Sequence, residues 1–178
     1  MRAGVYVQVP FCQTKCTYCN FHTGVVSSAR FAPYVEAVCA EIRGYRRLYG
    51  ASDIALPEAF DEAVVDTVYI GGGTPSLLDP VHLQSILDEI RATFRLNSEG
   101  EGTAQKKSFA EAQHSIAPGG RYSPEFVEVT LEADPETIEG EKATAWVRAG
   151  INRVSFGVQS FSDKELVAAG RMHRRADI

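Results

Sequence analysis

Near its start the sequence reads Val5-Tyr6-Val7-Gln8-Val9-Pro10-Phe11-Cys12-Gln13-Thr14-Lys15-Cys16-Thr17-Tyr18-Cys19, a β-branched run that passes directly into a loop with three cysteines. The run up to Val9, with Pro10 behind it, predicts a strand. The spacing CxxxCxxC brings three thiolates within reach of one inorganic centre. Thiolates are soft ligands that suit iron–sulfur clusters, zinc and copper(I). We therefore expect a metal-binding loop at the end of the first strand.

The number of cysteines in this loop separates the candidate centres. A structural zinc site uses four protein ligands, and no fourth cysteine follows at metal spacing. A [4Fe–4S] cubane held by Cys12, Cys16 and Cys19 leaves one iron open for a substrate or cofactor. His22 keeps a Cys3His zinc site as the alternative. A redox disulfide fits poorly because the pattern is not an isolated CxxC.

Length and composition indicate one globular domain. The chain has 178 residues, 44% of them hydrophobic and 23% charged, which is ordinary for a soluble protein. The net charge of −5 gives no domain-wide basic footprint for nucleic acid, and the basic run 171–175 is short. No secretion leader or membrane-spanning apolar run is evident, so we expect a cytoplasmic protein, where thiols stay unpaired.

Hydrophobic spacing predicts four strand–helix units. Strands are expected over residues 5–9, 64–70, 126–132 and 152–159, and helices over residues 31–49, 80–94, 139–148 and 162–170. Four such units imply an α/β fold with a parallel sheet and helices packed outside it. Residues 50–60 are expected to form a connector. Residues 97–123, rich in small and polar residues, are expected to form a flexible insertion.

Several details of these elements can be tested. In the third strand, Val127, Val129 and Leu131 should face one way, opposite Glu128, Thr130 and Glu132. In the fourth, Val154, Phe156 and Val158 should lie opposite Arg153, Ser155, Gly157 and Gln159. Asp79 should cap the second helix, Gly150 should end the third, and Ser162 with Glu165 should form a capping box on the last. Cys39 flanks a helical apolar stripe and should be a buried core thiol.

The second strand runs into Gly71-Gly72-Gly73-Thr74-Pro75. This is neither a Walker loop nor a GxGxxG motif, and three glycines after a strand are most often only a tight turn. Glycine does, however, let the backbone approach a ligand closely. The cysteine loop, the glycine turn, Glu132 and Gln159 all fall at the ends of predicted strands, where an α/β barrel gathers its chemistry. Their shared location predicts one site.

Seven stretches, taken in order and spacing, are more specific than any single motif. The first two are 6–12 and the three-cysteine loop, and the other five are 71–76, 131–135, 150–155, 157–161 and 170–173. They resemble the N-terminal part of the radical S-adenosylmethionine (SAM) group that contains oxygen-independent coproporphyrinogen III oxidase and the heme chaperones. The resemblance covers almost everything except the two irregular connectors.

The resemblance implies roles for individual residues. Cys12, Cys16 and Cys19 would hold a [4Fe–4S] cluster, and SAM would chelate its open iron. The matching SAM-contacting positions are Tyr6, Tyr18, Gly72, Gly73, Thr74, Glu132, Gln159 and Arg171. In this group the reduced cluster cleaves SAM to methionine and a 5′-deoxyadenosyl radical, which can abstract hydrogen from a substrate. The residue types suit these roles, because a carboxylate accepts hydrogen bonds from ammonium or hydroxyl groups and an arginine pairs with a carboxylate.

Two departures favour the heme-chaperone branch over the oxidase. Phe21 stands where the oxidase pattern has an additional cysteine, and only eleven residues precede Cys12. The chaperone branch implies heme or porphyrin as ligand, a heme-accepting protein and an electron donor as partners. Porphyrinogen oxidation remains the alternative. Gln8 stands where the group usually has histidine, so the usual contribution of that side chain is absent.

The family barrel has six strand–helix units, whereas four are predicted here. The resemblance therefore implies that residues 1–178 form the N-terminal portion of a radical SAM core domain, an incomplete barrel. The residues expected to hold heme would lie beyond it. We expect the chain to be a fragment, with an unpaired edge strand exposed.

Overall fold

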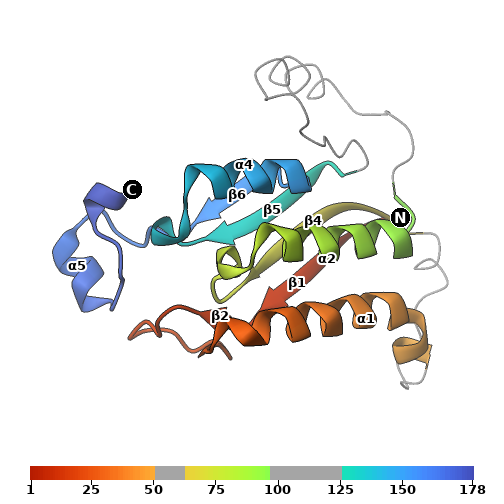
Figure 1. Ribbon diagram of the computed structural model, residues 1–178, viewed down its shortest axis with the longest axis horizontal. Coiled ribbons are helices and arrows are strands. Elements are labelled where there is room, and N and C mark those ends of the chain that lie inside the picture. Colours follow the sequence, from red (N-terminus) through yellow and green to blue (C-terminus); the bar gives the residue numbers. More distant parts are fainter. Residues whose placement is uncertain (51–62, 97–125) are drawn as a thin grey trace, which may run out of the picture.

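A computed structural model describes residues 1–50, 63–96 and 126–178, and in this part of the chain a parallel sheet carries helices on one face (Figure 1). The four strands are β1 (Arg2–Val9), β4 (Val64–Gly72), β5 (Glu128–Ala133) and β6 (Arg153–Phe156), and they lie in that order. The long helices are α1 (Phe31–Gly50), α2 (Pro80–Thr93) and α4 (Gly140–Ala149), followed by the short α5 (Asp163–Ala168). The four predicted strand–helix units and the parallel α/β sheet are confirmed.

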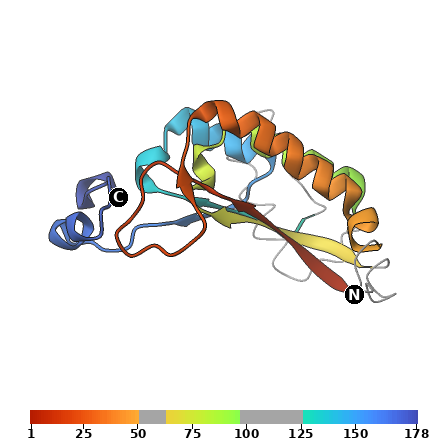
Figure 2. The same cartoon turned by 90° about the horizontal axis from the view of Figure 1, so that it is seen from below.

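Helices α1, α2 and α4 lie along one face of the sheet, with α2 between the other two (Figures 1 and 2). Helix α5 is different, because it lies beyond the C-terminal ends of the strands and does not cover the sheet. Two elements had no sequence signal. The short strands β2 (Phe11–Cys12) and β3 (Gly24–Val25) pair with each other on either side of the cysteine loop.

The strand register fixes the two faces of the sheet. Val7 pairs with Ile70, and Ile70 with Leu131, and all three are buried in the core beneath α2. The α2 side chains that fill this core are the predicted stripe Leu83, Ile86, Leu87 and Ile90, whereas Phe94 is only partly buried. Because side chains alternate along a strand, Tyr6, Tyr69 and Glu132 lie on the opposite face.

Most predicted helix ends are confirmed. The Asp79 carboxylate accepts a hydrogen bond from the Val81 amide, with Pro80 in the first helical position. Gly150 ends α4 at a φ of 107°, a conformation that glycine adopts without a Cβ penalty. The capping box on α5 is wrong, because the Ser162 side chain accepts no hydrogen bond from the helix. Before the helix, the Ser160 hydroxyl accepts a hydrogen bond from the Ser162 amide at 3.0 Å.

The predicted faces hold within β5, but two predicted strands are too long: residues 126 and 127 lie outside β5, and β6 ends at Phe156 rather than at residue 159. Val127 lies before β5 and is 63% exposed, whereas Thr130 is fully buried. The Thr130 hydroxyl donates to Glu128 Oε1 at 2.7 Å and accepts from Arg153 Nη1 at 3.1 Å, so its neighbours cover it. Phe156 is exposed at the end of β6 because α5 does not reach back over that strand.

The remaining predictions have mixed outcomes. Cys39 is a buried thiol as expected, 3.8 Å from the Ser85 carbonyl, and burial raises its pKa. The predicted connector over 50–60 falls almost wholly outside the described residues, and the insertion over 97–123 falls wholly outside them, so both stay predictions. None of the helices in the described ranges is long and apolar enough to span a membrane.

Truncating the α2 stripe tests the core. Leu87 is fully buried, so Leu87→Ala should lower the free energy of unfolding by about 2–5 kcal/mol through lost burial and the cavity left behind. Val81 lies on the same helix and is 61% exposed, so Val81→Ala should change it by less than about 0.5 kcal/mol. Urea unfolding of both variants measures the difference, and equal effects would contradict this core assignment.

Candidate functional site

A hollow of about 300 Å³ opens at the C-terminal ends of the strands. Its walls come from the cysteine loop, the glycine turn after β4, the ends of β5 and β6, and the segment after α5. Every residue expected to hold the cluster or to contact SAM lines this hollow except Tyr6. The expectation of one shared location is therefore met, although the roles of the individual residues remain predictions.

The glycine turn is pressed against the start of the cysteine loop. The Gly73 amide donates to the Val9 carbonyl at 2.8 Å, and the Thr74 amide donates to the Phe11 carbonyl at 2.6 Å. A Cβ on Gly73 would lie 2.3 Å from the Phe11 oxygen and 2.8 Å from Cys12 Sγ. Gly72 has a φ of 119°, which favours glycine. These glycines are therefore required for the two loops to meet.

Cys12, Cys16 and Cys19 are free thiols of intermediate exposure on the wall of the hollow. In the described ranges, no three Cys, His, Asp or Glu side chains converge as ligands of a single metal ion. A tetrahedral zinc would need its sulfurs about 3.8 Å apart, given Zn–S bonds of about 2.3 Å. A cubane binds each thiolate through a different iron, so its ligands stand further apart. His22, the fourth ligand of the zinc alternative, is exposed and is not among the lining residues.

Glu132 is held from two sides. The Tyr69 hydroxyl donates to its Oε1 at 2.6 Å, and the Gly72 amide donates to its Oε2 at 2.9 Å. The bond to Glu132 is the main cause that raises the Tyr69 pKa, so the phenol stays a donor. Tyr69 had not been predicted as part of the site. It pairs with Tyr6 of the neighbouring strand β1, on the same face of the sheet.

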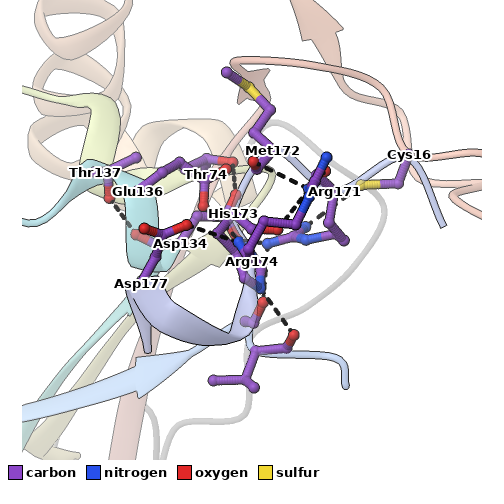
Figure 3. Close-up of polar contacts among 12 residues, drawn as sticks. Cys16, Thr74, Asp134, Glu136, Thr137, Arg171, Met172, His173, Arg174 and Asp177 are labelled. Carbon is purple, nitrogen blue, oxygen red and sulfur yellow. Dashed lines mark hydrogen bonds and ion pairs between the residues drawn. The ribbon is translucent and has the colours of Figure 1, made fainter. Parts of the chain in front are cut away.

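Arg171 reaches the hollow from the segment after α5 and is buried (Figure 3). Its Nη2 forms an ion pair with Asp134 and donates to the Gly157 carbonyl at 2.9 Å. Its Nη1 lies 3.4 Å from Cys16 Sγ. Burial by itself lowers the pKa of the guanidinium, but the bonds to Asp134 and Cys16 outweigh it and raise the pKa. The group therefore stays charged.

The Arg171 Nε is buried and has no hydrogen-bond partner among the described residues. An unsatisfied buried donor is costly and calls for an explanation. Arg171 lines the same hollow as the three free thiols, which is where an anionic group would meet its guanidinium. Asp134 itself lies within the stretch 131–135 of the resemblance, but no local pattern marks it as a site residue.

The amides of the glycine turn are already used within the chain. Those of Gly72, Gly73 and Thr74 donate to Glu132, Val9 and Phe11, as described above. The buried Thr74 hydroxyl donates to Asp134 Oδ2 at 2.9 Å. Ligand contacts from this turn would therefore come from its oxygen atoms and its Cα surface.

The remaining predicted residues differ in placement. Gln159 has a φ of 65°, a conformation that costs a non-glycine residue roughly 1–3 kcal/mol and that clusters at functional sites. Tyr18 is exposed on the wall of the hollow, and its pKa is raised by burial and by Cys16. Tyr6 is 59% exposed, and its ring contacts the Tyr69 ring in a tilted arrangement, with centroids 5.8 Å apart. It lies beside the site rather than in its wall.

The segment that carries Arg171 is fixed at two further points. The fully buried His173 contacts Glu136 Oε2 through Nδ1 at 3.1 Å and the Val158 carbonyl through Nε2 at 3.0 Å. The amide and hydroxyl of Thr17, inside the cysteine loop, donate to the carbonyls of Ala169 and Ala168. The end of the described chain therefore closes one side of the hollow.

The chain matches the Radical SAM superfamily over residues 6–178 and belongs to this family. Membership implies a [4Fe–4S] cluster and SAM, and the three cysteines of the motif are present. The chain is 31% identical over 170 residues to the heme chaperone HemW of Escherichia coli. The alignment covers 95% of this chain and 35% of that protein. It is 32% identical over 176 residues to the mitochondrial radical S-adenosyl methionine domain-containing protein 1 of Mus musculus, covering 99% of this chain and 31% of that protein.

Among solved structures, the coproporphyrinogen III oxidase HemN of Escherichia coli, a radical SAM enzyme, matches with a TM-score of 0.68 at 22% identity. The match covers 99% of this chain and 32% of that one, and at this identity it shows the fold alone. The described chain is therefore part of a radical SAM barrel. It spans about a third of the length of the curated relatives named here.

Adding a methyl group to the glycine turn should separate it from the cysteine loop. Gly73→Ala should lower the free energy of unfolding by about 1–3 kcal/mol, because its Cβ would meet backbone atoms that cannot yield cheaply. Gly44, within α1, has open space around it, so Gly44→Ala should raise stability by roughly 0.5–1 kcal/mol. Urea unfolding measures both, and a neutral Gly73→Ala would contradict the close approach.

Proposed function

We propose that this protein holds a [4Fe–4S] cluster on Cys12, Cys16 and Cys19 and binds SAM in the adjoining hollow, in the service of heme trafficking. The observation that supports it most is that three free thiols, a glycine turn and a buried arginine from distant parts of the chain line one hollow. Residues 1–178 would be the N-terminal portion of the radical SAM core domain.

The residues around the cysteines suit the cluster. The Arg171 Nη1 near Cys16 Sγ can donate a hydrogen bond to a thiolate, and such bonds tune iron–sulfur centres. The open wall of the hollow leaves room beside the thiols. When bound, the cluster and SAM supply reductive cleavage of SAM and radical chemistry. The protein orients both groups and excludes competing reactions.

The polar residues of the wall suit the charged ends of SAM. A carboxylate has about four acceptor positions, and Tyr69 and Gly72 use two of those on Glu132. The others can accept from an ammonium or from ribose hydroxyls. The unpartnered Nε of Arg171 can donate to the SAM carboxylate. Tyr18, Gly72, Gly73, Thr74 and Gln159 complete the proposed wall, with Tyr6 supporting it from beside Tyr69.

The heme-chaperone role rests on relatives. The bacterial relatives named HemW are about 31–32% identical to this chain where they match best. Phe21 also lies in the wall of the hollow and is 68% exposed, so this position offers an aromatic ring and no thiol. Both points favour heme binding and delivery over porphyrinogen oxidation.

Metal analysis tests the cluster. Anaerobically reconstituted protein should carry close to the four irons and four sulfides of a cubane, and Cys16→Ala should lose them. Cys39→Ala is the matched control, because that thiol lies in the core and should not affect metal content. Stoichiometric zinc without sulfide would instead support the Cys3His alternative and contradict the proposal.

A product assay separates the two branches. The reconstituted protein, given coproporphyrinogen III, SAM and a reductant, should release no carbon dioxide from the propionate side chains. Heme added to the protein should bind and then pass to an apo-heme protein, followed by absorbance. Decarboxylation coupled to SAM cleavage would contradict the chaperone role and support the oxidase.

A further inference from the structure

Asp134 lies where two strand ends meet the segment after α5 (Figure 3). It follows β5 directly, and its Oδ2 accepts the Thr74 hydroxyl from the end of β4 at 2.9 Å. Its Oδ1 forms the ion pair with Arg171. The carboxylate therefore ties the glycine turn to Arg171, which lies 37 positions after Asp134 in the chain.

The bonds of Arg171 fix the orientation of its guanidinium. An Nη2 carries two N–H groups, and here Asp134 and the Gly157 carbonyl are the two acceptors. This leaves Nη1 for the contact with Cys16 Sγ and Nε without a partner among the described residues. Nη1 and Nε are therefore the two nitrogens of the guanidinium that bond to no oxygen acceptor among the described residues.

The surroundings are shaped for this ion pair. A Cβ on Gly157 would lie 2.7 Å from Asp134 Oδ1 and 3.4 Å from Arg171 Nη2, so a side chain there would push into the pair. Both side chains are largely shielded from water, with 7% of Arg171 and 17% of Asp134 exposed. A buried arginine whose carboxylate partner is removed is left uncompensated and is free to turn toward other acceptors.

We infer that Asp134 is a positioning residue for the cofactor site, an inference that rests on the proposed function. By occupying Nη2, Asp134 holds the Arg171 guanidinium in the wall of the hollow, with Nη1 beside Cys16 and with Nε left for the carboxylate of SAM. It contributes to SAM binding through Arg171 and not by touching SAM. Through the Thr74 hydroxyl it also holds the glycine turn against the same arginine.

A double-mutant cycle tests this role. Asp134→Asn keeps the shape of the side chain and removes its charge. The SAM dissociation constant of the reconstituted full chain should rise about tenfold, as for other residues that orient a ligating group. In an Arg171→Gln background, titrated at SAM concentrations that saturate the weaker site, the same change should alter the constant by less than about twofold. The SAM-dependent change in the electron paramagnetic resonance spectrum of the reduced cluster should also differ between Asp134→Asn and the parent protein.

The control is Glu89→Gln, which removes an ion pair with Arg43 on the helical face and should leave SAM binding and the spectrum unchanged. An equal loss of affinity in both backgrounds would overturn the inference, as would an unchanged constant in Asp134→Asn or a loss of its iron and sulfide. If the parent protein itself held no iron or sulfide and bound no SAM, the proposed function would fall, and this inference with it.

Discussion

The close approach of Gly73 to the backbone of Phe11 is the constraint on which the site depends. Two loops that follow neighbouring strands meet there without room for a methyl group, and amide-to-carbonyl bonds on either side hold them together. The parallel register of β1 and β4 brings the loops to one edge of the sheet. The glycines then decide how close they come. Without that contact, Cys12 would not share a hollow with Thr74 and Glu132.

A second constraint acts from the other end of the described chain. Arg171 and His173 anchor the last segment to acceptors on the cysteine loop and on the ends of β5 and β6. The site is thus assembled from residues more than 150 positions apart. Its polar groups are mostly bonded to one another before any cofactor arrives, which pre-orients them and reduces the reorganisation needed on binding. Among the described residues that line the hollow, the Arg171 Nε and the Thr23 hydroxyl are buried without a hydrogen-bond partner.

Local patterns were enough to predict much of this arrangement. The period of α2 gave Leu83, Ile86, Leu87 and Ile90 as core residues, and Asp79 and Gly150 marked helix ends, because these features depend on neighbours in sequence. The burial of Thr130 and the roles of Tyr69 and Asp134 do not follow from such patterns. Their environments are set by Arg153, Glu132 and Arg171, which lie 23 to 63 positions away. Alternation along a strand cannot show that a threonine is covered by a neighbouring arginine.

The central claim is that the three cysteines leave one iron of a cubane open to SAM. Mössbauer spectroscopy of protein reconstituted with isotopically enriched iron tests it most directly. If the account is right, SAM should change the signal of a single iron site and leave the signals of the other irons in place. A spectrum that SAM does not alter, or iron that is not part of a cubane, would contradict it.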